Sequence, residues 1–350
     1  MLRHPKEIEC TEIIYGIDIL EDSIRELDTE LLNIMLLDRT TRKNILWATD
    51  DYVSLGAGFE MFSEITPDLI TGCYATLIQP RIAKSKNAQT GRTRGKGEVF
   101  TPSWICNKQN NLVDVQWFGR SNVFNIEKET SWMVISERIS FQGARKDWRK
   151  YVDAQRLEVC CGEAPYLISR YDTVTGKTIP LQQRIGLLDR KMRIVQENAE
   201  TPEEWLIWAQ RAFESVYGFE YQGDNLLLAR ENLLYSYIEY YKAKFHQMPG
   251  IQLLRKIARV ISWNIWQMDG LKYVVPGSCK PEEDCQITFS DLMDLEDDAI
   301  LVDTTSSCPG CATGNIYRHT GNYCRIMDWR SKQSQTFISM VKGERSNGRL

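Results

Sequence analysis

Four side chains near the C-terminus belong to the types that bind transition metals. They are Cys308, Cys311, His319 and Cys324 in the segment CPGCATGNIYRHTGNYC, and Cys279 and Cys285 precede them. A CxxC pair presents two thiolates to one tetrahedral zinc ion, and two further nitrogen or sulfur ligands from a nearby turn complete a closed structural site. The segment therefore predicts a structural zinc site formed by its three cysteines and its histidine. Because a second CxxC pair is missing, a reduced hairpin with buried thiols is the alternative.

A second set of residues follows short apolar runs in the middle of the chain. They are Glu158 and Gly162 in LEVCCGEAPYL, Glu220 in VYGFEYQ and Asp269 in NIWQMDGL. An adenosine cofactor requires a tight turn that it can approach closely, a carboxylate for the ribose hydroxyls and a polar group for the adenine. Each feature alone also fits an ordinary helix cap. Their order along the chain predicts that three neighbouring strand ends converge on one adenosine-sized pocket.

The elements around these runs alternate between strands and helices. Strands are predicted for RLEVCC (156–161), for VYGFEY (216–221) and, within the run 257–271, for a stretch that ends at Asp269. A turn and a helix are expected directly after the first strand in GEAPYLISRYD, a core-packed helix over 202–215 and a long amphipathic helix over 225–245. This alternation favours an α/β fold with a largely parallel sheet.

The N-terminal part of the chain supplies less specific signals. Residues 1–80 mix short apolar runs with turn residues and predict a small α/β segment. The stretch RIAKSKNAQTGRTRGKG (81–97) contains basic residues and no acidic residue, which predicts a loop or linker. A solvated connector is favoured over a phosphate-contacting loop, since exposed charge usually serves solvation. After it, Thr101 is predicted to cap a helix that opens with Pro102.

Four motifs together resemble the cofactor-binding motifs of adenine-specific (N6) DNA methyltransferases of restriction-modification systems, including proteins labelled restriction endonuclease subunit M. They are KGEVFTP (96–102), LEVCCGEAPYL, VYGFEYQGDNLLLARENLL and NIWQMDGL. The resemblance spans about residues 95–275 and implies a Rossmann-like, S-adenosylmethionine-dependent methyltransferase core. By this resemblance the residues that line the cofactor pocket are Phe100, Thr101, Pro102, Glu158, Cys161, Gly162, Glu163, Glu220, Tyr221, Asp269 and Leu271.

The chain departs from the family pattern in three ways. Ala164 stands where many relatives carry a second glycine, and Glu220 follows Gly162 by 58 positions, whereas the corresponding acid in dinucleotide folds follows after about 20. An insertion is therefore expected, with a hairpin at 171–180. The catalytic tetrapeptide, Asn or Asp followed by Pro-Pro and an aromatic residue, is absent, because no two prolines are adjacent. Those groups hold and stack the flipped adenine, so no catalytic residue is predicted and the chain is expected to be inactive alone.

Composition limits the classes of partner. The formal net charge is -4 and the pI is about 5.7, so no global positive field recruits nucleic acid and any DNA contact needs a local basic patch. No apolar stretch approaches the roughly 18 to 20 residues of a membrane span, and the N-terminus lacks the apolar core of a signal peptide. We therefore expect a cytoplasmic protein that has no membrane partner, with its ten cysteines as buried thiols or metal ligands.

These signals predict three parts: an N-terminal α/β segment and basic linker (1–94), an S-adenosylmethionine-binding, methyltransferase-like core (95–275) and a Cys-rich tail with a zinc hairpin (276–350). The leading hypothesis is a component of a DNA methyltransferase that methylates adenine N6 together with a catalytic or specificity/restriction subunit on another chain. The alternative is a noncatalytic DNA-binding or assembly subunit. An unrelated zinc-ribbon interaction protein would leave the three ordered cofactor motifs unexplained.

Overall fold

A small parallel sheet lies at the centre of the molecule. The computed structural model describes residues 21–98, 101–141, 147–281 and 308–341. The sheet has the order β3 (Arg156–Glu158), β4 (Val216–Glu220) and β5 (Ile265–Gln267), and both pairings are parallel. Within the described residues no sheet closes into a barrel. The prediction of an α/β fold with parallel strands in this order is therefore confirmed.

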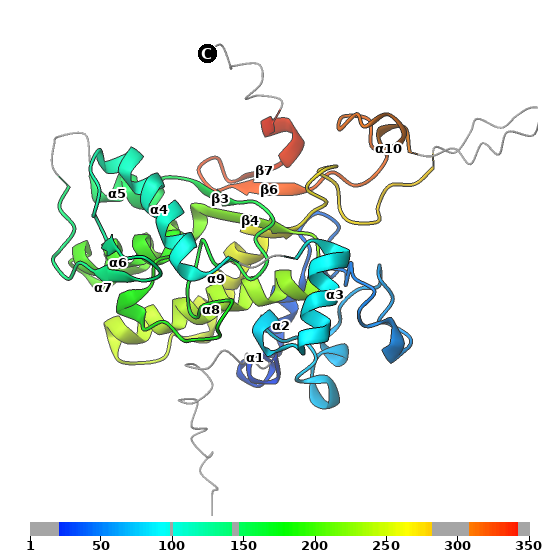
Figure 1. Ribbon diagram of the computed structural model, residues 1–350, viewed down its shortest axis with the longest axis horizontal. Helices are drawn as coiled ribbons and strands as arrows, with labels where there is room; N and C mark the ends of the chain where they lie inside the picture. The colour runs from blue at the N-terminus through cyan, green and yellow to red at the C-terminus, as the bar shows by residue number, and fades with distance from the viewer. Residues whose placement is uncertain (1–20, 99–100, 142–146, 282–307, 342–350) are drawn as a thin grey trace, which may run out of the picture.

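The two faces of this sheet are covered by different kinds of element. Helices α8 (Gly223–Phe245) and α9 (Ile251–Asn264) lie beneath it in Figure 1, and the antiparallel hairpin of β6 (Arg325–Asp328) and β7 (Gln333–Thr336) lies above it. The hairpin side packs through Tyr217, Trp266 and Phe337 in a small apolar cluster. Strands β4 and β5 are therefore shielded from water on both faces, as the strands of parallel sheets usually are.

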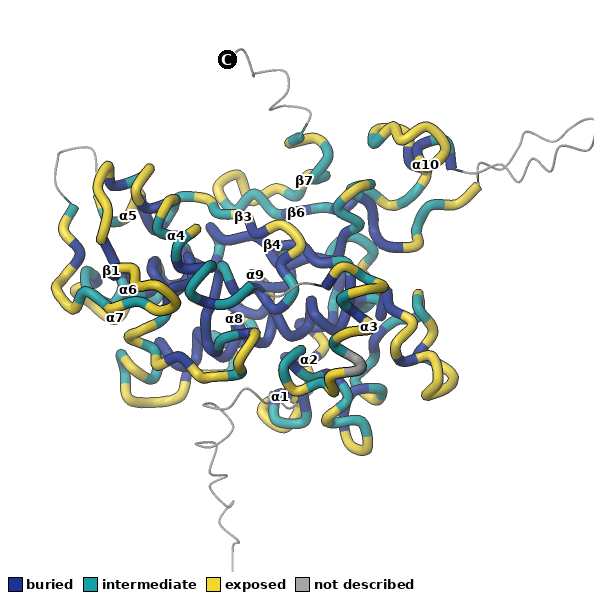
Figure 2. Tube along the Cα trace, in the orientation of Figure 1, coloured by how far each residue is buried: buried dark blue, intermediate teal, exposed yellow. Residues whose placement is uncertain are grey.

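Helix α8 is the central helix of the fold. Every residue from Gly223 to Tyr240 is buried, and Figure 2 shows this buried stretch under the sheet. The helix was predicted to be amphipathic, and this part of the prediction is wrong for Gly223–Tyr240, because the polar residues of this stretch are buried together with the apolar ones. Arg230, for example, is fully buried and donates to the backbone oxygens of Met35 and Ile265.

The N-terminal segment packs on the core instead of forming its own sheet. Helices α1 (Glu21–Leu27) and α2 (Thr29–Leu36) are followed by the short 3₁₀ turns η1 (Val53–Leu55), η2 (Pro67–Leu69) and η3 (Gly72–Tyr74). Between residues 21 and 80 the structure has only isolated β-bridges, so the predicted α/β character of this segment is not found there. Gln267 at the end of β5 exchanges two hydrogen bonds with the backbone of Leu46, and one hydrophobic cluster includes residues from both parts.

The basic stretch after it is helical. It forms η4 (Arg81–Ala83) and α3 (Lys86–Lys96), where a solvated loop was predicted. Several of its cations are engaged by carboxylates of the protein: Arg81 with Glu98, Lys84 with Asp224, Arg92 with Asp51, Glu98 and Asp224, and Lys96 with Asp50 and Asp51. Internal ion pairing, which composition does not reveal, explains why this polar segment folds onto the core.

The remaining helices of the described residues include α4 (Ser103–Phe118), α5 (Trp148–Asp153), α6 (Leu187–Asn198) and α7 (Pro202–Glu214), of which α5, α6 and α7 pack on one another. The hairpin of β1 (Asn125–Glu127) and β2 (Trp132–Val134), the 3₁₀ turn η5 (Leu181–Gln183) and the C-terminal α10 (Pro309–Thr313) are the other elements, and α10 lies at the opposite end of the molecule from α5 in Figure 1. Among the described helices, none combines the length and apolarity needed to cross a membrane.

Three local predictions can be compared with these elements. Helix α4 begins one residue after Pro102, which takes the N-cap position without a side-chain cap, so the predicted capping role of Thr101 is wrong. Instead, Asp172 accepts a hydrogen bond from the Ser103 N–H. The turn after β3 leads into further turns, not into a helix, and the predicted hairpin closes through the bridge between Tyr171 and Thr178.

Candidate ligand pocket and candidate metal centre

A pocket of about 630 Å³ opens at the carboxyl ends of β3 and β4. This is where parallel α/β sheets bind ligands, and the volume lies in the roughly 300–1,000 Å³ range of small-molecule sites. Its wall comes from the turn after β3, the end of β4, the end of α3 and the loop near residue 49: Ala48, Thr49, Asp50, Met61, Gly95, Lys96, Gly97, Glu98, Thr101, Glu158, Val159, Cys160, Cys161, Gly162, Pro165, Tyr166, Glu220, Tyr221, Gln222 and Asn225.

The turn after β3 has a backbone that favours glycine. Gly162 has φ +52°, a left-handed conformation that costs a residue with a Cβ roughly 1–2 kcal/mol. Its N–H donates to Oε2 of Glu220 at 2.8 Å, which ties the turn to the end of the neighbouring strand. Ala164, the departure from the family's second glycine, is also left-handed with φ +62° and is buried. The alanine therefore adopts a glycine-like backbone and lies outside the lining of the pocket.

Two buried carboxyl groups lie at the base of the pocket. Glu158 accepts hydrogen bonds from the N–H groups of Tyr166 and Leu167, and Glu220 accepts from Gly162 and Gln222. Burial raises the pKa of Glu158 to about 8, and the backbone donors only partly oppose this shift. Burial likewise raises the pKa of Glu220. The folded state therefore favours the protonated form of Glu158 at neutral pH, and a positively charged ligand beside it would favour the ionised form.

Helix α3 forms the opposite wall and is fixed by a buried ionic network. Arg92 is 3% exposed and lies 2.6 Å from both Asp224 and Glu98. Burial alone would raise the pKa of Asp224, but Lys84 and Arg92 outweigh it and lower this pKa. At the end of the helix, the Nζ of Lys96 lies 2.6 Å from Asp50. The network joins the N-terminal segment to α8 across one side of the pocket.

The structure brings together about half of the residues predicted for the cofactor pocket. Those that line it are Thr101, Glu158, Cys161, Gly162, Glu220 and Tyr221, and those that do not are Pro102, Glu163, Asp269 and Leu271. Phe100 lies outside the described residues. The three strand ends were expected to converge on one pocket. The ends of β3 and β4 do so, but the side chain of Asp269, which follows β5, does not line the pocket.

Local hydrogen bonding explains why the other side chains turn away. Glu163 is buried, where its carboxylate accepts from the Arg81 N–H and the Tyr171 hydroxyl, both at 2.6 Å. Asp269 closes its own turn by accepting from the N–H groups of Leu271 and Lys272. The side chain of Leu271 is 85% exposed.

Sequence reasoning missed the wall that comes from outside the three strand motifs. Thr49, Asp50 and Met61 belong to the N-terminal segment. Tyr166 and Gln222 lie within the recognised motifs LEVCCGEAPYL and VYGFEYQ but were not assigned to the pocket. The run ATDDY around Asp50 carries no spacing signal of its own. Only the pairing of its acids with Lys96, which needs the folded chain, places it at the pocket.

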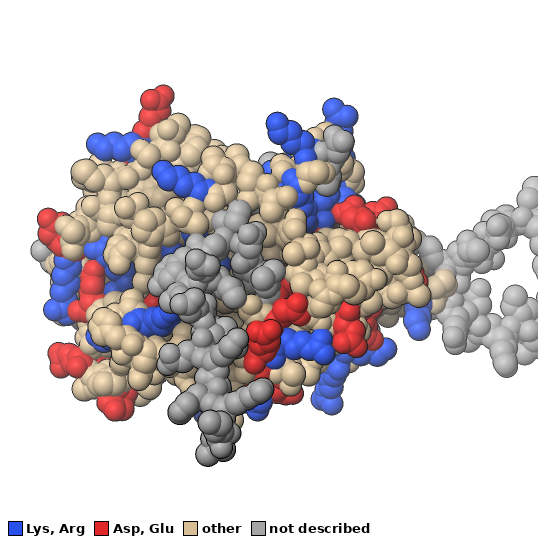
Figure 3. Space-filling model, turned by 90° about the horizontal axis from the view of Figure 1, so that it is seen from below, with Lys and Arg blue, Asp and Glu red and all other residues tan. Residues whose placement is uncertain are grey.

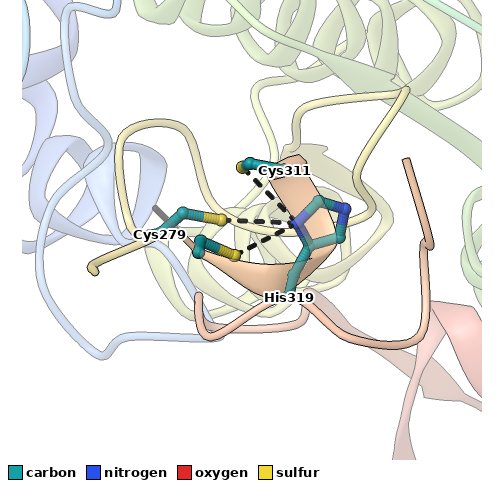
Figure 4. Close-up of side chains that lie close together, drawn as sticks. Cys279, Cys311 and His319 are labelled. Carbon is teal, nitrogen blue, oxygen red and sulfur yellow. Dashed lines mark hydrogen bonds between the residues drawn. The ribbon is translucent and has the colours of Figure 1, made fainter. Parts of the chain in front are cut away.

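A second cluster lies near the C-terminus and consists of three thiols and one imidazole. Cys279, Cys308 and Cys311 place their sulfur atoms 3.6, 3.6 and 3.7 Å from Nδ1 of His319, and all four ligand atoms lie within 4.8 Å of one another. Figure 4 shows Cys279 and Cys311 pointing toward the imidazole. A tetrahedral zinc with usual Zn–S and Zn–N distances separates sulfur from nitrogen by about 3.6 Å. These four residues therefore fit a metal ion.

The electrostatics of the cluster also favour a cation. Burial opposes ionisation of Cys308, but hydrogen bonds from Thr320 and Cys311 outweigh it and lower the thiol pKa to about 5. For Cys279, burial together with the neighbouring Cys308 and Cys311 raises the pKa to about 12. Thiols packed this closely cannot all ionise without a counter-charge. A divalent cation supplies that charge.

The predicted ligand set needs one correction. Cys308, Cys311 and His319 are brought together as expected, but Cys324 is not part of the cluster, and Cys279 takes the fourth position. Cys324 is fully buried beside β5, where its thiol donates to the carbonyl of Gln267. It directly precedes β6, and this register directs its side chain into the apolar cluster above the sheet.

No protein-family model, no curated protein and no solved structure matches this chain, so the pocket and the metal cluster are interpreted from their own chemistry.

Proposed function

We propose that the pocket at the ends of β3 and β4 binds S-adenosylmethionine, and that the chain is the cofactor-binding component of an adenine-N6 DNA methyltransferase with a Rossmann-like core. The observation that carries the proposal is the direct hydrogen bond between the Gly162 N–H and the Glu220 carboxylate at the base of an adenosine-sized cavity. It joins a glycine turn and an acidic strand end, the two features by which α/β folds hold an adenosine.

The acidic groups of the pocket suit this cofactor, because its positive charge would favour their ionised form. S-adenosylmethionine carries a positive sulfonium, and the carboxyl groups of Glu158 and Glu220 lie buried at the base of the cavity. Glu220 is assigned to the ribose hydroxyls, and the turn at Gly162 allows close approach of the cofactor. When bound, the cofactor supplies an activated methyl group, and the protein contributes by holding it in line with an acceptor amino group.

We assign the binding of the adenine that accepts the methyl group to another chain. None of the residues of this sequence form the Pro-Pro-aromatic motif that holds a flipped adenine. Within the described residues strand β3 pairs only with β4, and Leu157 in β3 and Val159 directly after it are 45% and 62% exposed. An unpaired edge of this kind pairs readily with a strand of a partner. A catalytic subunit docked there would lie next to the cofactor pocket.

The second candidate function is a noncatalytic DNA-binding or assembly subunit that keeps the fold without the cofactor. It is favoured by the hydrogen bonds that the Glu220 carboxylate already makes to the backbone and by the side chain of Asp269, which does not reach the pocket. Figure 3 shows lysine and arginine interspersed with acidic side chains on the face that it displays. That face therefore displays no continuous positively charged surface of the kind that attracts DNA.

We assign the Cys279, Cys308, Cys311 and His319 cluster to a structural zinc ion. The four residues would fill all four positions of a tetrahedron with protein ligands, which is the arrangement of structural sites, whereas catalytic zinc keeps an open position for water. The ion would join the chain after β5 to the segment before β6. In this assignment zinc stabilises the β6–β7 hairpin that covers the sheet, and it takes no part in methyl transfer.

Titration calorimetry with the wild-type chain separates the two candidate functions. The methyltransferase component is expected to bind S-adenosylmethionine with one site per chain in the absence of DNA. The noncatalytic subunit is expected to show no heat with the cofactor and to bind a short DNA duplex with an affinity that falls steeply with salt. The second result would overturn the proposed function.

A further inference from the structure

A group of basic residues lies on the outer face of α9, away from the cofactor pocket. Lys256, Arg259 and Trp263 follow one another at helical spacing, so they share one face of the helix. Lys256 and Arg259 are exposed, and Trp263 is half-buried. Helix α9 leads directly into β5, so its last turn lies at the amino end of this strand, whereas the pocket opens at the carboxyl ends of the neighbouring strands. None of the three residues lines that pocket.

The loop after α2 adds two arginines beside this face. Arg39 donates from Nε and Nη2 to the hydroxyl of Ser262 at 2.8 and 2.7 Å. Its guanidinium carbon lies 5.8 Å from the centre of the Trp263 ring. Arg42 is exposed in the same turn, where its N–H donates to the carbonyl of Asp38. The α9 basic face is defined by Arg39, Arg42, Lys256 and Arg259.

The acidic side chains of the neighbouring elements do not neutralise this face. Within the described residues no ion pair joins a member of the α9 basic face to a carboxylate, and Asp38 is buried where it accepts from the N–H groups of its own turn. Even with Asp38 counted against the four cations, an excess of three positive charges remains. The other acids act elsewhere: Asp28 and Glu30 on Arg255, Glu64 on Lys43, Glu214 on Arg211, and Asp328 within its own turn.

Arg39 is held in a position that disfavours its charge. Burial lowers the pKa of Arg39, the guanidinium of Arg259 lowers it further, and Asp38 opposes both effects. Surface arginines that serve only solvation do not bear this cost, because water surrounds them. An anion bound between Arg39 and Arg259 would relieve the repulsion, and incompletely compensated charges of this kind gather at functional sites.

We propose that the α9 basic face binds a single-stranded nucleic acid. The guanidinium groups of the three arginines match phosphate oxygens, and the ammonium of Lys256 adds a point charge. The indole of Trp263 lies among these cations and offers an aromatic surface to an unstacked base. A single strand presents phosphates and free bases together, whereas a duplex keeps its bases stacked.

A protein partner fits this face less well. The centre of a protein–protein interface is apolar and poor in charge. Among the described residues, none of the large apolar side chains that are exposed lies in the loop at 38–43 or on α9. The face is therefore charged without the apolar anchor that a protein partner would bury.

Fluorescence anisotropy with a labelled oligothymidylate of about 20 nucleotides tests the α9 basic face on the full chain. We expect the wild type to bind it with an affinity that falls as salt is raised. Arg259→Ala should bind about tenfold more weakly, and its plot of log affinity against log salt should be shallower by about 0.7, because one phosphate contact is lost. Arg94→Ala is the matched control, since Arg94 is also an exposed helical arginine but lies on α3. It should bind like the wild type.

The stacking contact has a separate readout. Trp263→Leu should weaken binding of the oligothymidylate about tenfold and leave the salt dependence unchanged, because the indole carries no charge. A salt dependence that falls as much as in Arg259→Ala would contradict stacking at Trp263.

Four results would overturn the proposal. They are no binding of the oligothymidylate by the wild type, equal weakening by Arg259→Ala and Arg94→Ala, equally tight binding of a DNA duplex of the same length, and equally tight binding of polyglutamate. The last two would assign the face to a duplex backbone or to an acidic protein. Glu220→Gln, which alters the cofactor pocket, should leave binding of the oligothymidylate unchanged, so the test is independent of the proposed function.

Discussion

At the scale of single residues, a strand motif predicts position in the chain but not the direction of a side chain. Gly162 and Glu220 lie at the pocket because backbone geometry fixes both: a left-handed turn in one case and the last residue of a buried strand in the other. Asp269 satisfies the same sequence pattern, yet it accepts hydrogen bonds within its own turn. Cys324 fails for a related reason, since its position directly before β6 places it in the apolar cluster.

The burial of Glu158 makes a prediction about pH. Its folded-state pKa is about 8, above the ordinary value of 4.5, so the folded state favours the protonated acid. The stability that this acid contributes is present below about pH 4.5 and is lost as the pH rises through 8. Glu158→Gln, which stays neutral, should therefore gain roughly 2–4 kcal/mol of unfolding free energy over wild type between pH 5 and pH 9.

Urea unfolding at a series of pH values measures this difference. Parallel curves of unfolding free energy against pH for Glu158→Gln and the wild type would contradict a raised pKa. Leu271→Ala, at an exposed position outside the pocket, should follow the wild-type curve at every pH.

At the scale of elements, hydrophobic periodicity predicts which segments form helices or strands. It fails for segments whose folding depends on ion pairs instead of apolar burial. The strands β3, β4 and β5 and the helix α7 were predictable because apolar residues recur at their characteristic spacing. Helix α3 was not, since its sequence is polar throughout and its folding depends on carboxylates that lie far away in the chain, such as Asp224. For the same reason α8 was predicted to have a solvated face that it does not possess.

Helix α3 therefore offers a direct test of buried ion pairing. Arg92→Ala removes a positive charge that pairs with the buried carboxylates of Asp224 and Glu98. This loss should lower the unfolding free energy by about 3–5 kcal/mol. Arg94→Ala, two residues away on the exposed side of the same helix, should change it by no more than about 0.5 kcal/mol. Chemical denaturation of both variants makes the comparison. Equal effects would show that the network around Arg92 does not hold the helix.

At the scale of the whole molecule, the cysteine cluster connects parts that the sequence separates. Cys279 follows β5, whereas Cys308, Cys311 and His319 precede the β6–β7 hairpin that covers the sheet. The two segments also exchange backbone hydrogen bonds, from Val275 to Asn322 and from Cys324 to Tyr273. The CxxC spacing predicted a site here, but the fourth ligand could not be chosen from the sequence, because it comes from across the fold.

Metal analysis of two variants distinguishes the ligand sets. Cys279→Ser should lose the roughly one equivalent of zinc that we expect on the purified chain, because a structural site binds weakly with three protein ligands. Cys324→Ala should retain the zinc. Chelation of the wild type should lower its thermal midpoint and loosen the hairpin over Trp266, which fluorescence would report. Retention of zinc by Cys279→Ser together with its loss from Cys324→Ala would reverse the assignment.

The cofactor pocket is tested most directly by equilibrium dialysis of labelled S-adenosylmethionine against Glu220→Gln, Leu271→Ala and the wild type. Removal of the Glu220 charge should weaken binding at least about tenfold, as expected for a lost charge-assisted hydrogen bond. Leu271→Ala, which lies outside the cavity, should bind like the wild type. If Glu220→Gln binds the cofactor as tightly as the wild type, or the wild type does not bind it, the ends of β3 and β4 do not form an S-adenosylmethionine site.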